Sequence, residues 1–261
     1  MLLKLDNPKL FSEIIGIISE LVLEVRIKVN KEGMSILAID PANVAMVSFK
    51  LPNTAFSELE VEGEEVLGVS LESLKAVLRR IRIGSVLVIT KIENELRLEI
   101  KDKIKREFNL ALIEIEGDEK QIPSLEFTSK IEMASNDFSE AIEDCVVVAD
   151  SCSFISRPDR FVIKAKGSLN SFKAEYTSDE ANITAGEADS KYSLEYLQKM
   201  IKAAKLTEKA IINFSDDYPL KLNFKTPFIE LSFILAPRVE TEDWWFVKGH
   251  NPIMDKFYSY K

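Results

Sequence analysis

The 261-residue sequence has little of the residues that usually carry redox, metal or proton-transfer chemistry, with one histidine and two cysteines. It also contains no apolar run of 18 residues, whereas a membrane-spanning helix needs about 20 predominantly apolar residues. The N-terminal residues lack a basic segment followed by a sustained apolar one, so no secretory signal is expected. We therefore expect a cytoplasmic protein with no membrane partner.

The two cysteines do not form a recognisable redox or metal-binding motif. Cys145 and Cys152 are seven residues apart in a segment predicted to be helical. One helical face would carry both, about 10 Å apart at 1.5 Å per residue, which is too far for a disulfide. We interpret them as buried thiols.

Motifs of catalysis are also missing. The sequence contains no glycine-rich phosphate loop, no nucleophile elbow and no cluster with metal-ligand spacing. The paired acids Asp216 and Asp217 shortly precede Pro219 and are read as turn residues rather than as an acid–base couple. We therefore expect no catalytic residues, no metal and no cofactor, and a protein that is not an enzyme.

Positive charge is in deficit. With 34 basic and 43 acidic side chains, the formal net charge is −9. This balance argues against a protein whose whole surface grips nucleic acid, although it permits a protein that confines its basic residues to one face.

The most informative feature that is present is an internal repeat of about 120 residues. SLESLKAVL from Ser70 resembles SLEYLQKMI from Ser193, at an offset of 123 residues. FSEIIGIISEL from Phe11 resembles FSEAIEDCVVV from Phe138, and FNLALI from Phe108 resembles IELSFI from Ile229. These three matches occur in order and at nearly constant offset, so the chain is read as a duplicated unit.

Each half of the repeat predicts the same secondary structure. Amphipathic helices are expected over 7–23 and 136–149, and a hairpin that turns at 30–33 follows the first. The second helix of each half begins at a serine N-cap, Ser70 or Ser193. The fold class is therefore α+β, with two duplicated domains of two helices packed on antiparallel sheet. Residues 1–116 and 126–240 form the domains, 117–125 the connector, and 241–261 a tail.

Basic residues gather on the second helix of each half. At 100° per residue, Lys75, Arg79 and Arg82 fall within about 60° of one another, opposite the apolar face. Any amphipathic helix exposes some lysines, so an ordinary solvated face is the alternative reading. Two matched basic helices in an acidic protein instead favour a surface that attracts a phosphate backbone without reading bases. The expected DNA-facing residues are Lys75, Arg79, Arg80, Arg82, Lys199, Lys202 and Lys205.

Three local matches connect this duplicated architecture to a known family. They are AIDPANVAMV from Ala38, QIPSLEF from Gln121 and ILAPRVETED from Ile234. With them, the chain resembles the DNA sliding clamps of the proliferating cell nuclear antigen family, archaeal type, from Met1 to about Asp243.

The resemblance implies a DNA polymerase processivity factor for DNA replication and repair. Three subunits would form a pseudo-sixfold ring around double-stranded DNA, without sequence specificity, in association with the nucleoid. Its partners would be DNA polymerase, ligase, flap nuclease and a clamp loader, and the ring would close through strand edges near 106–115 and 169–177. The apolar partner groove would be lined by Ile39, Asn43, Val44, Met46, Ile122, Pro123, Pro219, Ile234, Leu235, Ala236 and Pro237.

Several positions depart from the family pattern. Asn43 stands where many clamps have histidine, and Lys120 where a connector leucine is usual. The first helices expose no basic side chain at the positions expected to face DNA, which are Ser12, Glu13, Gly16, Ser19, Glu20, Glu140 and Glu143. These departures favour a specialised or regulatory subunit of a heterotrimer over a homotrimer, and the sequence leaves both open. A further alternative is an α+β assembly scaffold that never touches DNA.

The C-terminal octet NPIMDKFY resembles the short motif by which partners bind clamps. Met254 occupies the aliphatic position and Phe257 and Tyr258 the aromatic pair, while Asn251 replaces the usual glutamine. One turn of tight helix would place these apolar side chains on one side. We hypothesise that the tail occupies the groove; the alternatives are that the aromatic residues near Trp244 extend the last strand, or that the tail docks on a different protein.

Overall fold

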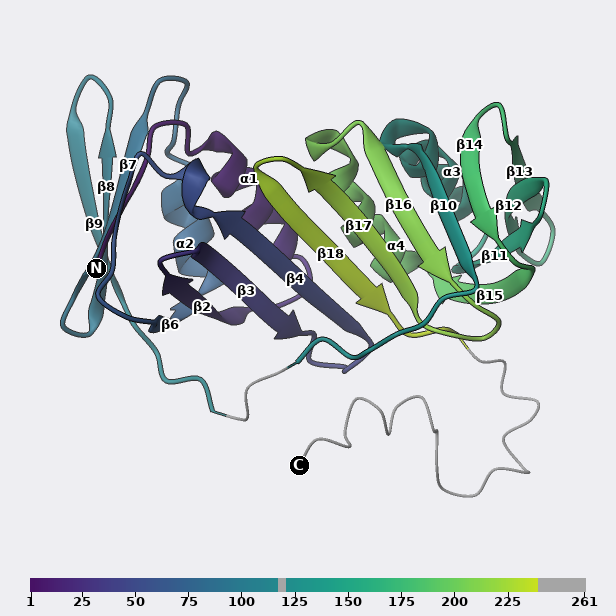
Figure 1. Ribbon diagram of the computed structural model, residues 1–261, viewed down its shortest axis with the longest axis horizontal. Helices are drawn as coiled ribbons and strands as arrows, with labels where there is room; N and C mark the ends of the chain where they lie inside the picture. The colour runs from purple at the N-terminus through teal and green to yellow at the C-terminus, as the bar shows by residue number, and fades with distance from the viewer. Residues whose placement is uncertain (117–120, 239–261) are drawn as a thin grey trace. The chain divides into compact units, whose positions relative to one another are not determined.

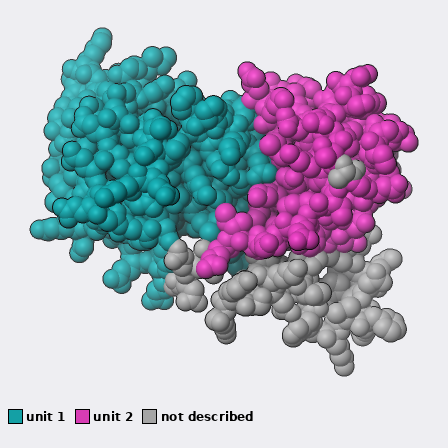
Figure 2. All heavy atoms as spheres, in the orientation of Figure 1, with its two compact units in different colours: residues 1–120, 205–207, 223–233 teal, residues 121–204, 208–222, 234–261 magenta. Residues whose placement is uncertain are grey.

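The structure, a computed structural model, describes residues 1–116 and 121–238 (Figure 1). The described residues cluster into two compact units, coloured separately in Figure 2. Unit 1 comprises those within 1–120, 205–207 and 223–233, and unit 2 comprises those within 121–204, 208–222 and 234–238.

The first half of the chain contains two α-helices and a series of short strands. In chain order these are β1 (Leu2–Leu5), α1 (Lys9–Ile18), β2 (Glu24–Asn30), β3 (Gly33–Ile39), β4 (Ala45–Pro52), the 3₁₀-helix η1 (Asn53–Ala55), β5 (Glu58–Glu60), β6 (Glu65–Ser70), α2 (Leu71–Leu78), β7 (Val86–Ile92), β8 (Glu95–Lys101) and β9 (Lys105–Ala111).

The second half repeats this order of helices and strands. It contains β10 (Ser129–Ala134), α3 (Ser135–Val148), β11 (Ser151–Arg157), β12 (Arg160–Lys166), β13 (Ser171–Thr177), β14 (Ala181–Ala185), β15 (Ala188–Ser193), α4 (Leu194–Met200), the 3₁₀-helix η2 (Ile201–Leu206), β16 (Lys209–Phe214), β17 (Leu220–Thr226) and β18 (Ile229–Leu235). The predicted duplication and the α+β fold class are confirmed.

The first hairpin forms where strict alternation predicts it. Val25, Ile27 and Val29 are buried on one face of β2, and the register with β3 closes on the pair Asn30 and Gly33. Gly33 has φ of 135°, and a Cβ there would lie 2.1 Å from the carbonyl oxygen of Leu51. Only glycine accepts that backbone conformation at so close an approach, so the turn is fixed by this residue.

Unit 1 contains a five-stranded sheet in the order β5-β1-β7-β8-β9 and a run of strands β4-β3-β2-β6, with β18 next to β4. The chain crosses from the first to the second after β9, where the N–H of Ile113 donates to the carbonyl of Gly68 in β6 at 3.0 Å. Helices α1 and α2 pack on each other, and α1 buries Phe11, Ile14, Ile15, Ile17 and Ile18. The core of unit 1 therefore lies beneath this helix pair.

Unit 2 contains a four-stranded sheet in the order β13-β12-β11-β15 and strands in the order β14-β10-β16-β17. Helix α3 lies against β10, β11, β12, β13 and β16, and it also packs on α4. The ring of Phe154 is at the centre of this core, in edge contact with those of Phe138, Phe161, Tyr192 and Phe214.

Helix α1 is shorter than the sequence predicts. It spans Lys9–Ile18 instead of 7–23, because Pro8 stands at its N-cap and the chain tightens after Ile18. The N–H groups of Glu20 and Leu21 bond to the carbonyls three residues back, at 3.1 and 3.0 Å, which ends the α-helical pattern.

The prediction that both cysteines lie on one helix is wrong. Helix α3 ends at Val148, and after a short turn Cys152 lies in β11, so only Cys145 is helical. Both thiols are buried and free, and they are hydrogen-bonded to each other rather than 10 Å apart. Burial raises the pKa of Cys152, and the same hydrogen bond lowers that of Cys145.

Candidate nucleic-acid and partner-binding sites

The positions of the basic residues in unit 1 are determined by where α2 begins and ends. The hydroxyl oxygen of Ser70 accepts from the N–H of Ser73 at the N-cap, and the apolar face that includes Leu74 is buried. The helix ends at Leu78, and the N–H of Arg79 still donates to the carbonyl of Lys75 four residues back, so the helical projection holds for Lys75 and Arg79. Arg79 is the C-cap residue, and Arg80 and Arg82 belong to the turn that follows.

Lys75 is the least available of these cations. Its ammonium forms an ion pair with Glu20 at 3.5 Å, whereas Arg79, Arg80 and Arg82 are exposed. The carbonyl of Arg80 accepts from the guanidinium of Arg106 in β9 at 3.2 Å, which connects this turn to the five-stranded sheet. Unit 1 thus exposes an arginine-rich turn directly after α2.

Asp102 adds a carboxylate next to this turn. The N–H of Ile104, followed by the charge and hydrogen bond of Arg106 and the charge of Arg82, lowers the pKa of Asp102 below its ordinary value. Asp102 therefore remains ionised at neutral pH, where it positions the Arg106 side chain through their ion pair.

The basic residues of the second half of the chain lie on two consecutive helices. Lys199 on α4 forms an ion pair with Glu195 at 2.9 Å and lies 5.1 Å above the ring of Tyr196. Lys202 and Lys205 are exposed on the 3₁₀-helix η2 rather than on a continued α-helix. Both halves of the chain therefore place exposed cations just after their second helix.

The positions of the first helices that the sequence expects to face DNA carry no basic side chain, although α1 begins with the exposed Lys9. Ser12 on α1 and Ser19 at its C-cap donate to the carbonyls of Leu78 and Gly16, at 3.2 and 2.7 Å. Helix α3 exposes Glu140 and Glu143. The helical surfaces thus carry both charge signs, with most of the positive charge on the second helices and the residues after them.

The groove positions of unit 1 surround a loop that one carboxylate holds in place. Asp40 is 4% exposed and accepts from the N–H groups of Ala42, Val44 and Ala45, at 3.1, 2.7 and 2.6 Å. Asn43, which is exposed, adopts a positive φ of 57° at the tip. Sequence reasoning omitted Asp40, although an aspartate before a Pro-x-Asn turn is a local signal for this capping.

The groove positions differ in how much of each side chain is accessible. In unit 1, Ile39 and Val44 are half-buried, while Met46 is buried and packs into the core. In unit 2, Ile122 is exposed and Pro123, Ala236 and Pro237 are half-buried. Pro219, Ile234 and Leu235 are buried and support the backbone beneath.

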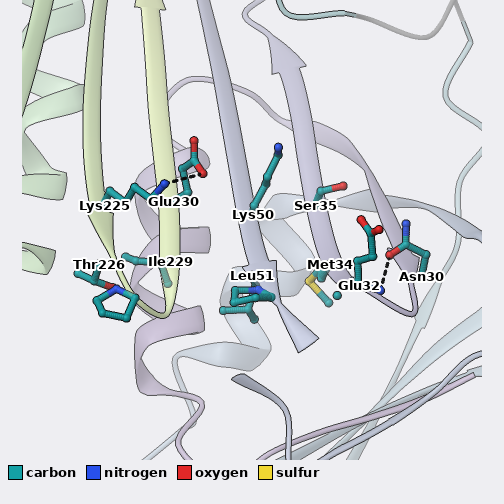
Figure 3. A pocket seen from close by; sticks show the side chains of 13 residues that line it. Asn30, Glu32, Met34, Ser35, Lys50, Leu51, Lys225, Thr226, Ile229 and Glu230 are labelled. Atoms are coloured by element: carbon teal, nitrogen blue, oxygen red, sulfur yellow. Dashed lines mark hydrogen bonds and ion pairs between the residues drawn. The ribbon is translucent and has the colours of Figure 1, made fainter. Parts of the chain in front are cut away.

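A cavity of about 300 Å³ lies elsewhere in unit 1 (Figure 3). It is at the Gly33 end of the β3–β4 hairpin, whereas Ile39 and Met46 pair at the opposite end. Lys50 and Ser35 line it together with Lys225, which forms an ion pair with Glu230 at 3.6 Å. None of the predicted groove residues lines this cavity.

Of the strands at sheet edges, β9 and β13 each have one side without a strand partner within the described residues. β9 ends the five-stranded sheet and β13 ends the four-stranded sheet, so each carries one row of backbone groups without a strand partner. Both overlap the segments near 106–115 and 169–177 at which the sequence predicts contact between subunits. Phe108 and Leu110 on β9, and Phe172 and Tyr176 on β13, are half-buried.

Other predicted features fall outside the described part of the chain. These are Lys120 in the connector and the tail residues Asn251, Met254, Phe257 and Tyr258. Within residues 1–116 and 121–238, no group of three or more His, Cys, Asp or Glu side chains could hold a metal ion. No described helix is long and apolar enough to cross a membrane.

Comparison with known proteins gives one consistent family. The family model described as proliferating cell nuclear antigen, N-terminal domain, matches residues 1–121, and that of the C-terminal domain matches residues 121–239. A DNA polymerase sliding clamp of Thermococcus onnurineus is 34% identical over 243 residues, which is 90% of this chain and 97% of the relative. A DNA polymerase sliding clamp of Nanoarchaeum equitans is 33% identical over 241 residues, covering 89% and 97%.

Solved structures agree with these relatives. The crystal structure of PCNA from Thermococcus kodakaraensis is 29% identical with a TM-score of 0.84, covering 91% of this chain and 99% of that chain. A chain of the PCNA2-PCNA3 complex from Sulfolobus tokodaii is 27% identical with a TM-score of 0.84, covering 92% and 100%.

Proposed function

The chain belongs to the proliferating cell nuclear antigen family, and from that premise we propose that it is a DNA polymerase sliding clamp that encircles double-stranded DNA. The observation that carries this function is the match of both family domains, which together span residues 1–239. Archaeal relatives that cover about nine-tenths of the chain are named as sliding clamps. The protein would act as a non-catalytic processivity factor.

The physical basis of such a clamp is topological. A closed ring cannot leave a long duplex sideways, so its contacts with DNA need only be weak. Exposed cations after α2 and α4 suit weak contacts, because phosphate contacts are independent of sequence and are screened by salt. These contacts would come from Arg79, Arg80, Arg82, Lys202 and Lys205, with Lys75 and Lys199 next to them.

Ring closure would use the unpaired sides of β9 and β13. An edge strand that pairs with a different edge strand on the next copy makes a heterologous contact, which forms a ring when the rotation closes. Both edges occur in one chain, which suits a homotrimer. The acidic helix α3, and the likeness to a PCNA2-PCNA3 complex, support a subunit of a heterotrimer as the second candidate.

The mass of the purified chain in solution distinguishes these assemblies. Light scattering on an eluting peak close to three chain masses indicates a homotrimer. A monomer or dimer that reaches trimer mass only with a second clamp chain indicates a heterotrimer.

DNA synthesis tests the function itself. The chain, or the trimer that contains it, is added with the clamp loader, ATP and replicative polymerase of the same cell to a primed circular template. We expect full-length products from single binding events, because the ring keeps the polymerase at the primer end. Product lengths that do not change with the chain present, at any loader concentration, would contradict the function.

The partner groove would bind short motifs of polymerase, ligase, flap nuclease and the clamp loader. The accessible apolar residues Ile39, Val44, Ile122, Ala236 and Pro237 would receive the aliphatic and aromatic side chains of the motif. Asp40 would hold the loop in the conformation that presents Val44.

The tail would compete with those partners for the groove. Its octet has the spacing of the partner motif, and 17 residues separate Pro237 from Met254. Extended, this segment spans up to roughly 55 Å, and tethering gives an effective concentration on the order of millimolar. A weak motif could therefore exclude partner peptides.

A truncated chain ending at Asp243 tests this competition. We expect it to bind a fluorescent partner peptide much more tightly than the full chain does. A full chain with Met254→Ala and Phe257→Ala should behave like the truncated one. Equal peptide affinity of all three proteins would contradict the proposed role of the tail without affecting the clamp function.

A further inference from the structure

Lys75 and Lys199, from the proposed DNA-facing cations, each have a carboxylate partner in their own unit. Lys75 forms an ion pair with Glu20 at 3.5 Å, and the two side chains are only 24% and 34% exposed. Lys199 forms an ion pair with Glu195 at 2.9 Å, with exposures of 30% and 74%. In both units, therefore, a lysine of the second helix is paired with a carboxylate.

The other cations of the set are differently placed. Arg79, Arg80 and Lys205 are exposed, and none of them forms an ion pair with a residue in the described part of the chain. They all follow the second helix of their half of the chain, in the turn after α2 or on η2. The charge available to an external phosphate is therefore shifted from the helices to the residues after them.

We propose that Glu20 and Glu195 are internal counter-ions that hold Lys75 and Lys199 away from DNA phosphates. This inference rests on the proposed function. It separates the basic residues that contact DNA phosphates from Lys75 and Lys199, whose charge an internal carboxylate neutralises. Fewer phosphates are then neutralised by each subunit, so the ring holds DNA more weakly and slides with less resistance. The salt dependence of binding should also be shallower than the number of basic residues implies.

The geometry of the two pairs predicts unequal strengths. Glu20 lies in the turn after α1, so its pair with Lys75 connects that turn to α2, and both side chains are partly shielded from solvent. Shielded pairs are less weakened by salt than exposed ones. Glu195 precedes Lys199 by four residues on α4, which is the favourable order on a helix, but its side chain is largely exposed. Glu20 should therefore have the larger effect.

Removal of the two carboxylates tests the inference on the full, assembled protein. The variant Glu20→Gln with Glu195→Gln keeps side-chain size and frees both lysines. Binding to a short open-ended duplex is followed by fluorescence anisotropy across a range of salt concentrations. We expect affinity at low salt to rise by about three- to tenfold, with a steeper slope of log affinity against log salt.

Glu13→Gln with Glu143→Gln is the matched control. Glu13 lies on α1, two turns before Glu20, and Glu143 lies on α3. Neither forms an ion pair within the described residues, so this variant makes the same change in net charge without freeing a lysine. An equal gain from the control would show a general charge effect and overturn the inference, as would an unchanged slope in the first variant.

Lysine variants supply the second readout. Lys75→Gln with Lys199→Gln should change DNA affinity little in the wild-type background and should remove the gain in the Glu20→Gln, Glu195→Gln background. Arg79→Gln with Arg82→Gln should weaken binding in both. If the arginine variant alone has its expected effect, the internal counter-ions are disproved and the DNA face remains. If the arginine variant leaves binding unchanged, the proposed DNA face fails as well.

Discussion

At the scale of single residues, buried or shielded polar groups determine how surfaces of this protein are presented. The Asp40 carboxylate accepts three backbone N–H groups and thereby fixes the loop that carries Val44. Tyr192, fully buried, donates its hydroxyl to the carbonyl of Tyr218 at 2.7 Å. Desolvation raises the pKa of Tyr192, so it stays a neutral donor across the physiological range.

Tyr176 makes the stability of unit 2 depend on pH in the alkaline range. Burial, followed by the charges of Asp137 and Asp144, raises its pKa from 10 to about 12. The unfolded chain loses the proton near pH 10 while the folded chain keeps it, so the contribution is complete below pH 10 and is lost as the pH rises towards 12.

Urea unfolding of wild type and Tyr176→Phe at several pH values measures this effect. We expect a constant difference in unfolding free energy below pH 10, and above it a progressive loss of stability in the wild type relative to the phenylalanine variant. Parallel curves through pH 12 would contradict the raised pKa.

At the scale of secondary-structure elements, the hairpins and the repeat could be predicted from sequence, whereas the ends of helices could not. Alternating burial in β2 and the glycine at 33 are local signals. The end of α2 depends on packing, and the N–H of Arg80 already bonds to the carbonyl of Val77 three residues back, so the helical projection of Arg82 failed. For the same reason, the sequence did not reveal that Cys152 turns back onto Cys145, or that Met46 and Ile234 are buried.

Two glycines show that the effect of a glycine-to-alanine substitution on stability depends on how close the neighbouring backbone lies. A Cβ on Gly68 would lie 1.9 Å from the carbonyl oxygen of Ile113, where the chain crosses onto β6, whereas a Cβ on Gly16 in α1 meets nothing within 4 Å. We expect Gly68→Ala to destabilise the protein by about 1–3 kcal/mol. Gly16→Ala should stabilise it by about 0.5–1 kcal/mol. Thermal unfolding compares the two, and a neutral Gly68→Ala would contradict the described crossing.

Substitutions on the edge strands β9 and β13 are expected to impair assembly of the subunits more than folding of the chain. Phe108 on β9 and Phe172 on β13 are half-buried at unpaired edges, so an aspartate at either position would place a charge in the proposed subunit contact. We expect Phe108→Asp and Phe172→Asp each to reduce the mass measured by light scattering to that of fewer subunits, with circular dichroism unchanged.

Asn109→Asp, on the exposed face of β9, is the control and should preserve the wild-type mass. Retention of that mass by both phenylalanine variants would show that the subunits meet elsewhere.

At the scale of the whole molecule, a strongly acidic chain can function on DNA because a closed ring stays on the duplex without a high affinity for it. The net charge of −9 would oppose side-on binding to a polyanion, and the exposed cations after α2 and α4 offset it only locally. A ring needs no more than that, since local contacts only have to permit sliding. The central claim is therefore topological rather than energetic.

Threading onto linear DNA tests that claim most directly and needs no clamp loader. The assembled protein is incubated with a linear duplex whose ends are open, blocked by a bulky protein beforehand, or blocked after incubation. The account predicts retention through a high-salt wash only when the ends are blocked after incubation. Equal retention on all three duplexes, or none on any of them at protein concentrations that maintain the ring, would contradict encirclement.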